Sequence, residues 1–147
     1  MAEYLAPLQN VNLNTPVVMN ASIKCTKGYI YHQDGTGIFI LRGITNGRFA
    51  RYNVLFKANI AVPEGGTAGP IAIAITLNGE PIMASRSIAT PAAAGDYNVA
   101  FCLKDIDVPA GCCFNLAIEP VTAYNDGTTP PQVISLQNGV FTINRTA

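Results

Sequence analysis

The longest alternating segment of the chain is the feature that most constrains its fold. From Tyr52 to Val62, apolar side chains occupy every second position, and Arg51, Lys57 and two asparagines share the opposite face. Successive side chains of a β-strand point to opposite faces, so this pattern predicts a long strand with one buried face. Similar segments recur to the C-terminus and leave little room for a helix. The sequence therefore predicts an all-β protein.

Turn motifs divide the remaining chain into further strands. Asp34-Gly35 and Asn78-Gly79 are typical of tight hairpins, in which glycine adopts a positive φ, and Pro109-Ala110-Gly111 predicts another reversal. Asn138-Gly139 predicts either a hairpin turn or a bulge. No connection has the helix length that parallel pairing requires. About eight to ten strands arranged in this way predict an antiparallel β-sandwich or jelly roll.

One strand is expected to be irregular. The alternation from Tyr97 to Leu103 predicts that these odd-numbered side chains point inward, whereas the apolar pattern from Ile106 onward continues out of phase. A bulge near Lys104 or Asp105 would bring both parts of the strand onto the same buried face.

The chain is expected to contain one sandwich domain preceded by an arm. Its 147 residues fit a single domain with a sizeable core. Residues 1–27 are rich in Asn, Pro and Thr and contain one short apolar run at 16–19, which predicts an N-terminal arm carrying one short strand. Residues 28–147 then form the sandwich.

The scarcity of charge predicts contact with other chains. Charged residues make up 12% of the sequence, against about 25% in an average soluble domain. Because obligate interfaces are depleted in charge, we expect self-association; the alternative is a neutral monomer surface rich in alanine and asparagine.

Several classes of partner are not expected. Nine basic residues balance nine acidic ones and no basic run occurs, so the sequence does not predict nucleic-acid binding. No apolar stretch approaches the length of a membrane span, and the N-terminus lacks the features of a signal peptide. We therefore expect synthesis in the cytosol of the producing cell, no membrane partner, and free thiols at the four cysteines.

The sequence offers little chemistry for catalysis or metal binding. His32 is the only histidine, no serine lies in a nucleophile-elbow motif, and no cysteine pair has zinc-ligand spacing. Asp105, Asp107, Glu119 and Asp126 could supply oxygens to calcium, but they follow no calcium-loop series. We expect His32 to bond locally in its hairpin, and we expect no enzyme activity, metal or cofactor.

One loop could bind a carbohydrate. Tyr124, Asn125 and Asp126 lie in a segment rich in hydroxyl and amide side chains, and an aromatic ring beside such groups is what a sugar-binding surface needs. An ordinary exposed turn would have the same composition.

The order of motifs after Gly28 resembles a known superfamily. It is similar to the tumour-necrosis-factor-like (TNF-like) jelly roll, which includes complement-type heads and bacterial spore-surface trimers. The resemblance covers residues 28–145 and depends on motifs in this order: Ile73 to Ile82 around Asn78-Gly79, Tyr97 to Phe101, Val108 to Gly111, Phe114 to Ile118 and Phe141 to Arg145.

The whole chain also resembles small proteins encoded by phages and prophages of gut bacteria, which look like structural proteins of the virion head. The residues that carry this resemblance include Met1 to Pro7, Gly43 to Asn46, Ala58 to Pro63 and Asp107 to Cys113. The TNF-like resemblance implies a homotrimer, and its axis-facing aromatic positions fall on Tyr52 and on Tyr97 or Phe101.

These features together predict a non-enzymatic structural protein of a phage virion. The expected form is a trimeric jelly roll that decorates the capsid, with the arm of residues 1–27 bound to the capsid protein or to a neighbouring subunit. The alternative is a receptor-binding tip in which the Tyr124 loop contacts glycans of a host surface.

Overall fold

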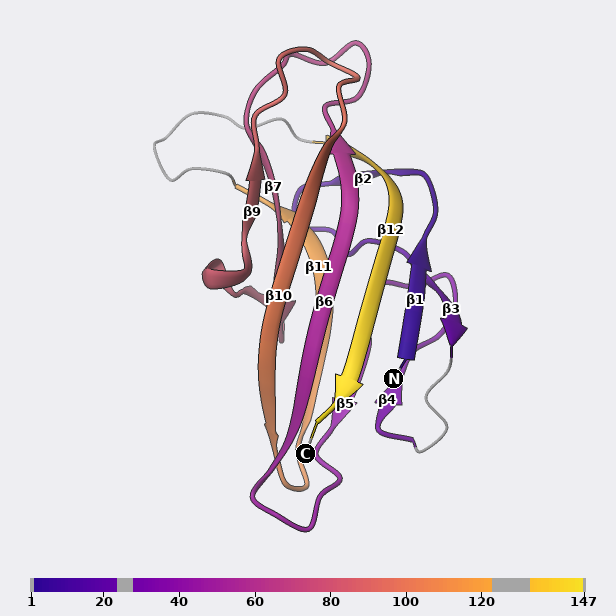
Figure 1. Cartoon of the computed structure of the whole chain (residues 1–147), viewed down its shortest axis with the longest axis vertical. Coiled ribbons are helices and arrows are strands. Elements are labelled where there is room, and N and C mark those ends of the chain that lie inside the picture. The colour runs from indigo at the N-terminus through magenta and orange to yellow at the C-terminus, as the bar shows by residue number, and fades with distance from the viewer. Residues whose placement is uncertain (1, 24–27, 123–132, 147) are drawn as a thin grey trace.

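The chain forms a sandwich of two antiparallel sheets. The computed structural model describes residues 2–23, 28–122 and 133–146. Within these ranges each sheet has six strands, and the sheets pack face to face (Figure 1). The predicted all-β, antiparallel architecture is confirmed.

The two sheets draw their strands from alternating parts of the sequence. The first sheet has the order β10 (Asn98–Pro109), β6 (Phe49–Ala61), β12 (Val133–Arg145), β1 (Ala2–Ala6) and β3 (Asn20–Ile23), with β2 (Gln9–Asn12) against β12. The second has the order β4 (Ile30–Tyr31), β5 (Phe39–Arg42), β11 (Cys113–Val121), β7 (Ile71–Leu77) and β8 (Glu80–Pro81), with β9 (Ser87–Ala89) against β7. A short 3-10 helix, η1 (Met83–Ser85), precedes β9.

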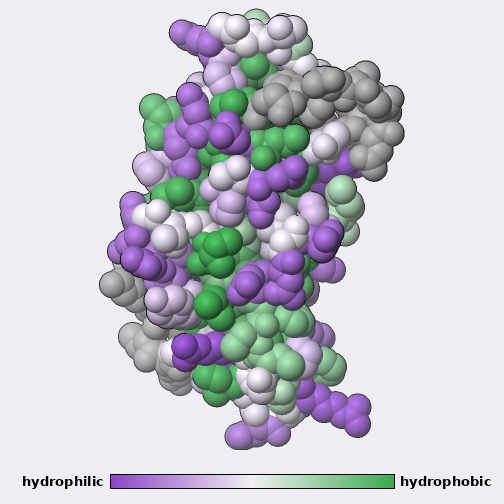
Figure 2. All heavy atoms as spheres, turned by 180° about the vertical axis from the view of Figure 1, so that it is seen from behind, coloured by the Kyte–Doolittle hydropathy of each residue, from purple (hydrophilic) through white to green (hydrophobic). Residues whose placement is uncertain are grey.

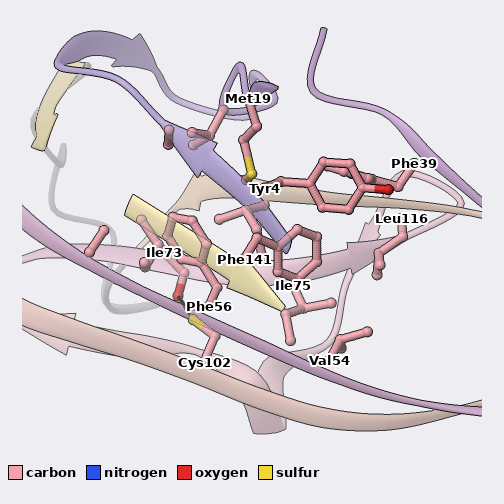
Figure 3. Close-up of a cluster of buried hydrophobic side chains, with 14 of the residues drawn as sticks. Tyr4, Met19, Phe39, Val54, Phe56, Ile73, Ile75, Cys102, Leu116 and Phe141 are labelled. Carbon is pink, nitrogen blue, oxygen red and sulfur yellow. Dashed lines mark hydrogen bonds between the residues drawn. The ribbon is translucent and has the colours of Figure 1, made fainter. Parts of the chain in front are cut away.

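The core lies between the sheets and is filled largely by even-numbered residues of β6. Tyr52, Val54 and Phe56 of that strand are completely buried, as the alternation predicts. Phe56 contacts Phe141 edge to face at 6.0 Å between ring centroids, and Phe141 contacts Phe39 of the second sheet at 5.0 Å. Figure 3 shows these rings beside further apolar side chains from both sheets.

The predicted turns are present. Asn78 and Gly79 both adopt positive φ, at 52° and 84°, which is the geometry of the two-residue hairpin joining β7 to β8. Gly35 has φ 84° in the turn between β4 and β5. The Asn138-Gly139 motif forms a bulge, because the register of β12 against β6 shifts between Gln137 and Val140.

The bulge predicted near Lys104 or Asp105 is wrong. β10 pairs with β6 in unbroken register from Asn98 to Pro109, so one set of alternate residues points inward throughout. The buried set is even-numbered: the small residues Ala100 and Cys102 point inward in place of the predicted odd-numbered set, whereas Ile106 and Val108 are buried as predicted. Small residues are needed there because the strands approach closely, with the Cys102 thiol 3.7 Å from the Ile73 carbonyl oxygen of β7.

The interpretation of residues 1–27 as an arm with one short strand is also wrong. Its described part contains three strands, and Ala2, Tyr4 and Ala6 of β1 point into the core. The Gln9 amide bonds both backbone groups of Val18, which ties the following segment to β2. The alternation of β1 was missed because two of its three inward side chains are only methyl groups.

Candidate interaction surface

The outer side of the first sheet carries a group of apolar side chains, with Lys57 among them. Strand register places Phe101 of β10, Lys57 of β6, Val140 of β12 and Leu5 of β1 in one row across the sheet. The adjacent row contains Leu103, Leu55, Thr142 and Glu3. We call the apolar members of these rows, together with Val99, the apolar outer patch: Leu5, Leu55, Val99, Phe101, Leu103 and Val140.

The members on β10 are large and exposed. Val99, Phe101 and Leu103 retain 66%, 53% and 53% of their accessible surface, although their inward neighbours on the same strand are an alanine and a cysteine. A strand that buries its small side chains and exposes its large ones gains little from folding alone. Contiguous exposed apolar surface of this kind marks a site of interaction with another molecule.

The same face becomes polar toward the lower end of the sheet. Arg51 Nε and Nη2 donate to the two carboxylate oxygens of Asp107 at 2.7 and 2.8 Å, and Asn53 Nδ2 donates to Asp105 Oδ1 at 2.8 Å. The hydrogen bonds from Arg51 lower the pKa of Asp107 below its usual value. Asp105 and Asp107, considered above as calcium ligands, are thus bonded to side chains of the neighbouring strand.

Tyr52 does not belong to this surface. Its side chain is completely buried between the sheets, and its hydroxyl donates to the Arg42 carbonyl oxygen at 2.6 Å and lies 3.1 Å from that of Tyr29. The position carried over from the resemblance is therefore wrong for a contact with another chain, because Tyr52 is one residue out of phase with the exposed positions of β6.

Tyr97 and Phe101 do lie at the outer surface. Tyr97 is 40% exposed, and its hydroxyl is 2.9 Å from Ser135 Oγ of β12, across the intervening strand β6. Phe101 lies between Val99 and Leu103 along the outer face of β10. Its backbone N–H donates to Ser87 Oγ at 3.2 Å. Their role in a trimer remains a prediction. Sequence reasoning missed Val99 and Leu103 as surface residues, because alternation along β10 distinguishes its two faces but does not say which of them is buried.

The loop predicted to bind carbohydrate lies outside the described residues. Tyr124, Asn125 and Asp126 all fall within 123–132, so the glycan hypothesis stays a prediction.

The opposite side of the molecule is formed by the second sheet. Figure 2 shows apolar side chains along the middle of this face, with polar side chains on both flanks. Tyr31 of β4 and Ile38 before β5 are 54% and 42% exposed. Further along, β7 has buried alanines on its outward positions, Ala72 and Ala74. This side thus exposes fewer large side chains per strand than β10 does.

His32 has the structural role expected for it. Its Nε2 is 2.8 Å from the Thr36 carbonyl oxygen, and its ring stacks on Phe39 at 4.1 Å between centroids. Asp34 does not orient the imidazole, because its Oδ1 accepts from the Ala21 backbone N–H at 2.8 Å. The prediction that His32 bonds locally in its hairpin is confirmed.

The remaining candidates for chemistry are separate from one another. Glu119 is buried on β11 and accepts a hydrogen bond from Thr76 at 3.0 Å; burial raises the pKa of its carboxyl group. Cys102 is buried, which raises the pKa of its thiol to about 12, whereas Cys112 and Cys113 are free and exposed. Among the described residues, no three metal-ligating side chains come together, and no helix could span a membrane.

Solved structures of animal proteins are similar to this chain. The globular domain of zebrafish complement 1qA protein matches with a TM-score of 0.61 and 14% identity, covering 99% of this chain and 97% of that one. Eiger TNF from S. frugiperda matches with a TM-score of 0.66, 12% identity and coverage of 99% and 91%. Murine APRIL at pH 5.0 matches with a TM-score of 0.57 and 12% identity, covering 95% of this chain and 97% of that one. The fold is a TNF-like jelly roll.

The likeness of this TNF-like jelly roll to the solved structures extends over nearly the whole chain, but the identities are low and show the fold alone. No protein-family model matches the sequence. No curated protein matches it either.

Proposed function

We propose that this protein is a non-enzymatic structural protein that assembles as a homotrimer through the outer side of its first sheet. The observation that supports this proposal is the orientation of β10, which exposes Val99, Phe101 and Leu103 while burying Ala100 and Cys102. A second copy would cover the apolar outer patch and recover the free energy of burying it.

A second copy is favoured as the occupant because the whole chain is charge-poor. Charged residues make up only 12% of the sequence, as expected of a chain whose surface is partly an obligate interface. The patch is asymmetric, since its large residues gather on edge strand β10, while Val140 lies two strands away and Leu5 lies three strands away. Such a surface suits a heterologous contact, in which different parts of two copies meet, and such contacts can close into a ring of three.

We further propose that the trimer decorates the head of a phage virion. This finer part rests on the resemblance of the whole sequence to phage and prophage head proteins. The route of attachment predicted from the sequence runs through residues 1–27; since β1 and β2 are hydrogen-bonded to β12, this contact would be made by strands of the sandwich itself.

Analytical ultracentrifugation of the purified chain tests the assembly. We expect a species of three times the 15.5 kDa chain mass, and we expect Phe101→Asp to shift it to monomer. Tyr31→Asp is the matched control, because Tyr31 has nearly the same exposure, 54%, on the second sheet. A stable wild-type monomer, or equal dissociation by both variants, would contradict the proposal.

A further inference from the structure

The fold separates charges that cancel in the sequence. Arg42 ends β5, Arg48 and Arg51 flank the start of β6, and Arg145 ends β12, so four of the nine basic residues lie at one end of the molecule. This is the end at the bottom of Figure 1, where the β5–β6 loop, the β10–β11 turn and the C-terminus meet. We call Arg42, Ile44, Arg48, Phe49 and Arg51 the basic tip.

Two guanidinium groups of the basic tip have no acidic partner in the described chain. Arg51 is held by Asp107, and Arg145 lies over the Tyr29 ring at 4.4 Å. Arg42 and Arg48 are exposed, and within the ranges described above the sole ion pair is that of Arg51 with Asp107. The tip therefore presents two uncompensated cations beside a compensated one.

Exposed apolar side chains accompany these arginines. Ile44 and Phe49 retain 48% and 49% of their accessible surface in the same loop and at the first position of β6. Arginine and aromatic residues are the types enriched at protein–protein interfaces and among the residues that contribute most to binding.

Both ends of the loop that carries the tip are hydrogen-bonded to the β10–β11 turn. Gly43 exchanges backbone hydrogen bonds with the β10–β11 turn, donating to Cys112 O at 2.8 Å and accepting from Gly111 N at 2.9 Å. Ala110 N donates to Arg48 O at 2.9 Å. A Cβ atom at position 43 would lie 2.0 Å from Pro109 O, so only glycine allows this approach. A loop fixed at both ends loses less conformational entropy on binding than a free one.

We infer that the basic tip is a docking site for an acidic protein surface. Its two free guanidinium groups call for carboxylates, which arginine binds in bidentate fashion, and the exposed side chains of Ile44 and Phe49 call for apolar contact. A protein partner is favoured over nucleic acid because the arginines cluster at a narrow end and do not form the basic stripe along a face that a phosphate backbone requires.

This docking site does not depend on self-association. The apolar outer patch and the basic tip have no residue in common: the patch lies in the middle of the first sheet, and the tip comprises the loop before β6 and the first residues of that strand. If three copies assemble as proposed, the tips would bind a repeated acidic surface with higher avidity than a single tip.

Selection from a displayed library of random twelve-residue peptides on the immobilised full chain tests the inference. We expect enrichment of peptides that combine Asp or Glu with an apolar residue. The double variant Arg42→Ser/Arg48→Ser should bind the synthesised peptides about tenfold more weakly or worse. Arg86→Ser/Lys104→Ser is the control, since it removes two cations that do not belong to the basic tip; circular dichroism checks that each variant is folded.

Three outcomes would overturn the inference: no enrichment of acidic peptides, equal weakening by both double variants, or tip-dependent binding to single-stranded DNA or phosphatidylserine vesicles with none to the peptides. Peptide binding is measured whether the chain is a monomer or a trimer in solution. A negative result for the docking site can therefore be distinguished from a negative result for the proposed trimer.

Discussion

The two faces of the first sheet differ in what their apolar residues achieve. The inner face buries Tyr52, Phe56 and Phe141 completely, whereas the outer face leaves Phe101 and Leu103 about half exposed. Inner-face residues stabilise each chain by leaving water on folding. Outer-face residues of similar size can contribute only when a second molecule covers them. The difference gives two kinds of stability, one independent of protein concentration and one dependent on it.

Phe141→Ala should have the largest effect on the inner face. The ring contacts Phe39 and Phe56, and it is completely buried. We expect a loss of about 3–5 kcal/mol in the free energy of unfolding, from lost burial and from the cavity left behind. Urea titration at several protein concentrations measures it. If the loss in unfolding free energy disappeared at high protein concentration, the inner face would not differ from the outer face in this respect.

Leu103→Ala should act in the opposite manner. Its side chain is 53% exposed, so unfolding of the dilute chain should change by less than about 0.5 kcal/mol. Sedimentation equilibrium should show association weakened by about tenfold, if the leucine is buried between copies. Unchanged association would remove Leu103 from the interface and narrow the apolar outer patch.

Tyr52→Phe distinguishes a role of Tyr52 in the core from a role in the interface between copies. We expect a loss of about 1–2 kcal/mol in unfolding free energy, because the hydroxyl no longer bonds the Arg42 carbonyl oxygen. Association should be unaffected, since the ring is inside one chain. A selective change in association, with stability unchanged, would restore Tyr52 to the interface.

Glu119→Gln tests how a buried carboxyl group on the outer side of the second sheet affects stability at different pH. Burial raises the pKa of Glu119, so the folded chain binds this proton more tightly than the unfolded chain does. Stability from this group is present below its usual pKa of 4.5 and is lost as pH rises through the raised value. Above that range the variant should melt at a slightly higher temperature than the wild type, and at lower pH the two should coincide.

Arg51→Gln should have the smallest effect. The bidentate pair with Asp107 is exposed to water, and such pairs contribute little to stability. Its hydrogen bonds lower the pKa of Asp107, so the small contribution is present above the usual value of 3.8 and is lost on acidification. Thermal melting at low and high salt should differ less in the variant than in the wild type.

The regular parts of the fold could be predicted from the sequence because local rules decide them. Alternation along residues 51–62 identified β6, and the Asp34-Gly35 and Asn78-Gly79 motifs identified their hairpins, since a strand's side-chain period and a turn's φ angles depend on neighbouring residues. These local rules could not predict which face of β10 is buried. It depends on how closely β7 approaches Cys102, which is a contact between residues 29 apart in sequence.

The candidate surface was only partly predictable for the same reason. Phe101 and Tyr97 were placed at the surface by the resemblance, and the structure puts both there, but it moves Tyr52 into the core and adds Val99 and Leu103. The basic tip was not predicted, because its arginines at positions 42, 48 and 51 are separated by uncharged residues and the net charge of the chain is zero.

The sequence by itself determined an all-β chain with defined turns, a low charge content and no grouping typical of a catalytic centre. Tertiary structure alone decided which face of β10 is covered, that the N-terminal strands belong to the sandwich, and which charges gather at one end. Periodicity and turn chemistry act between near neighbours, whereas burial and the field of separated charges depend on which distant segments the sheets bring together.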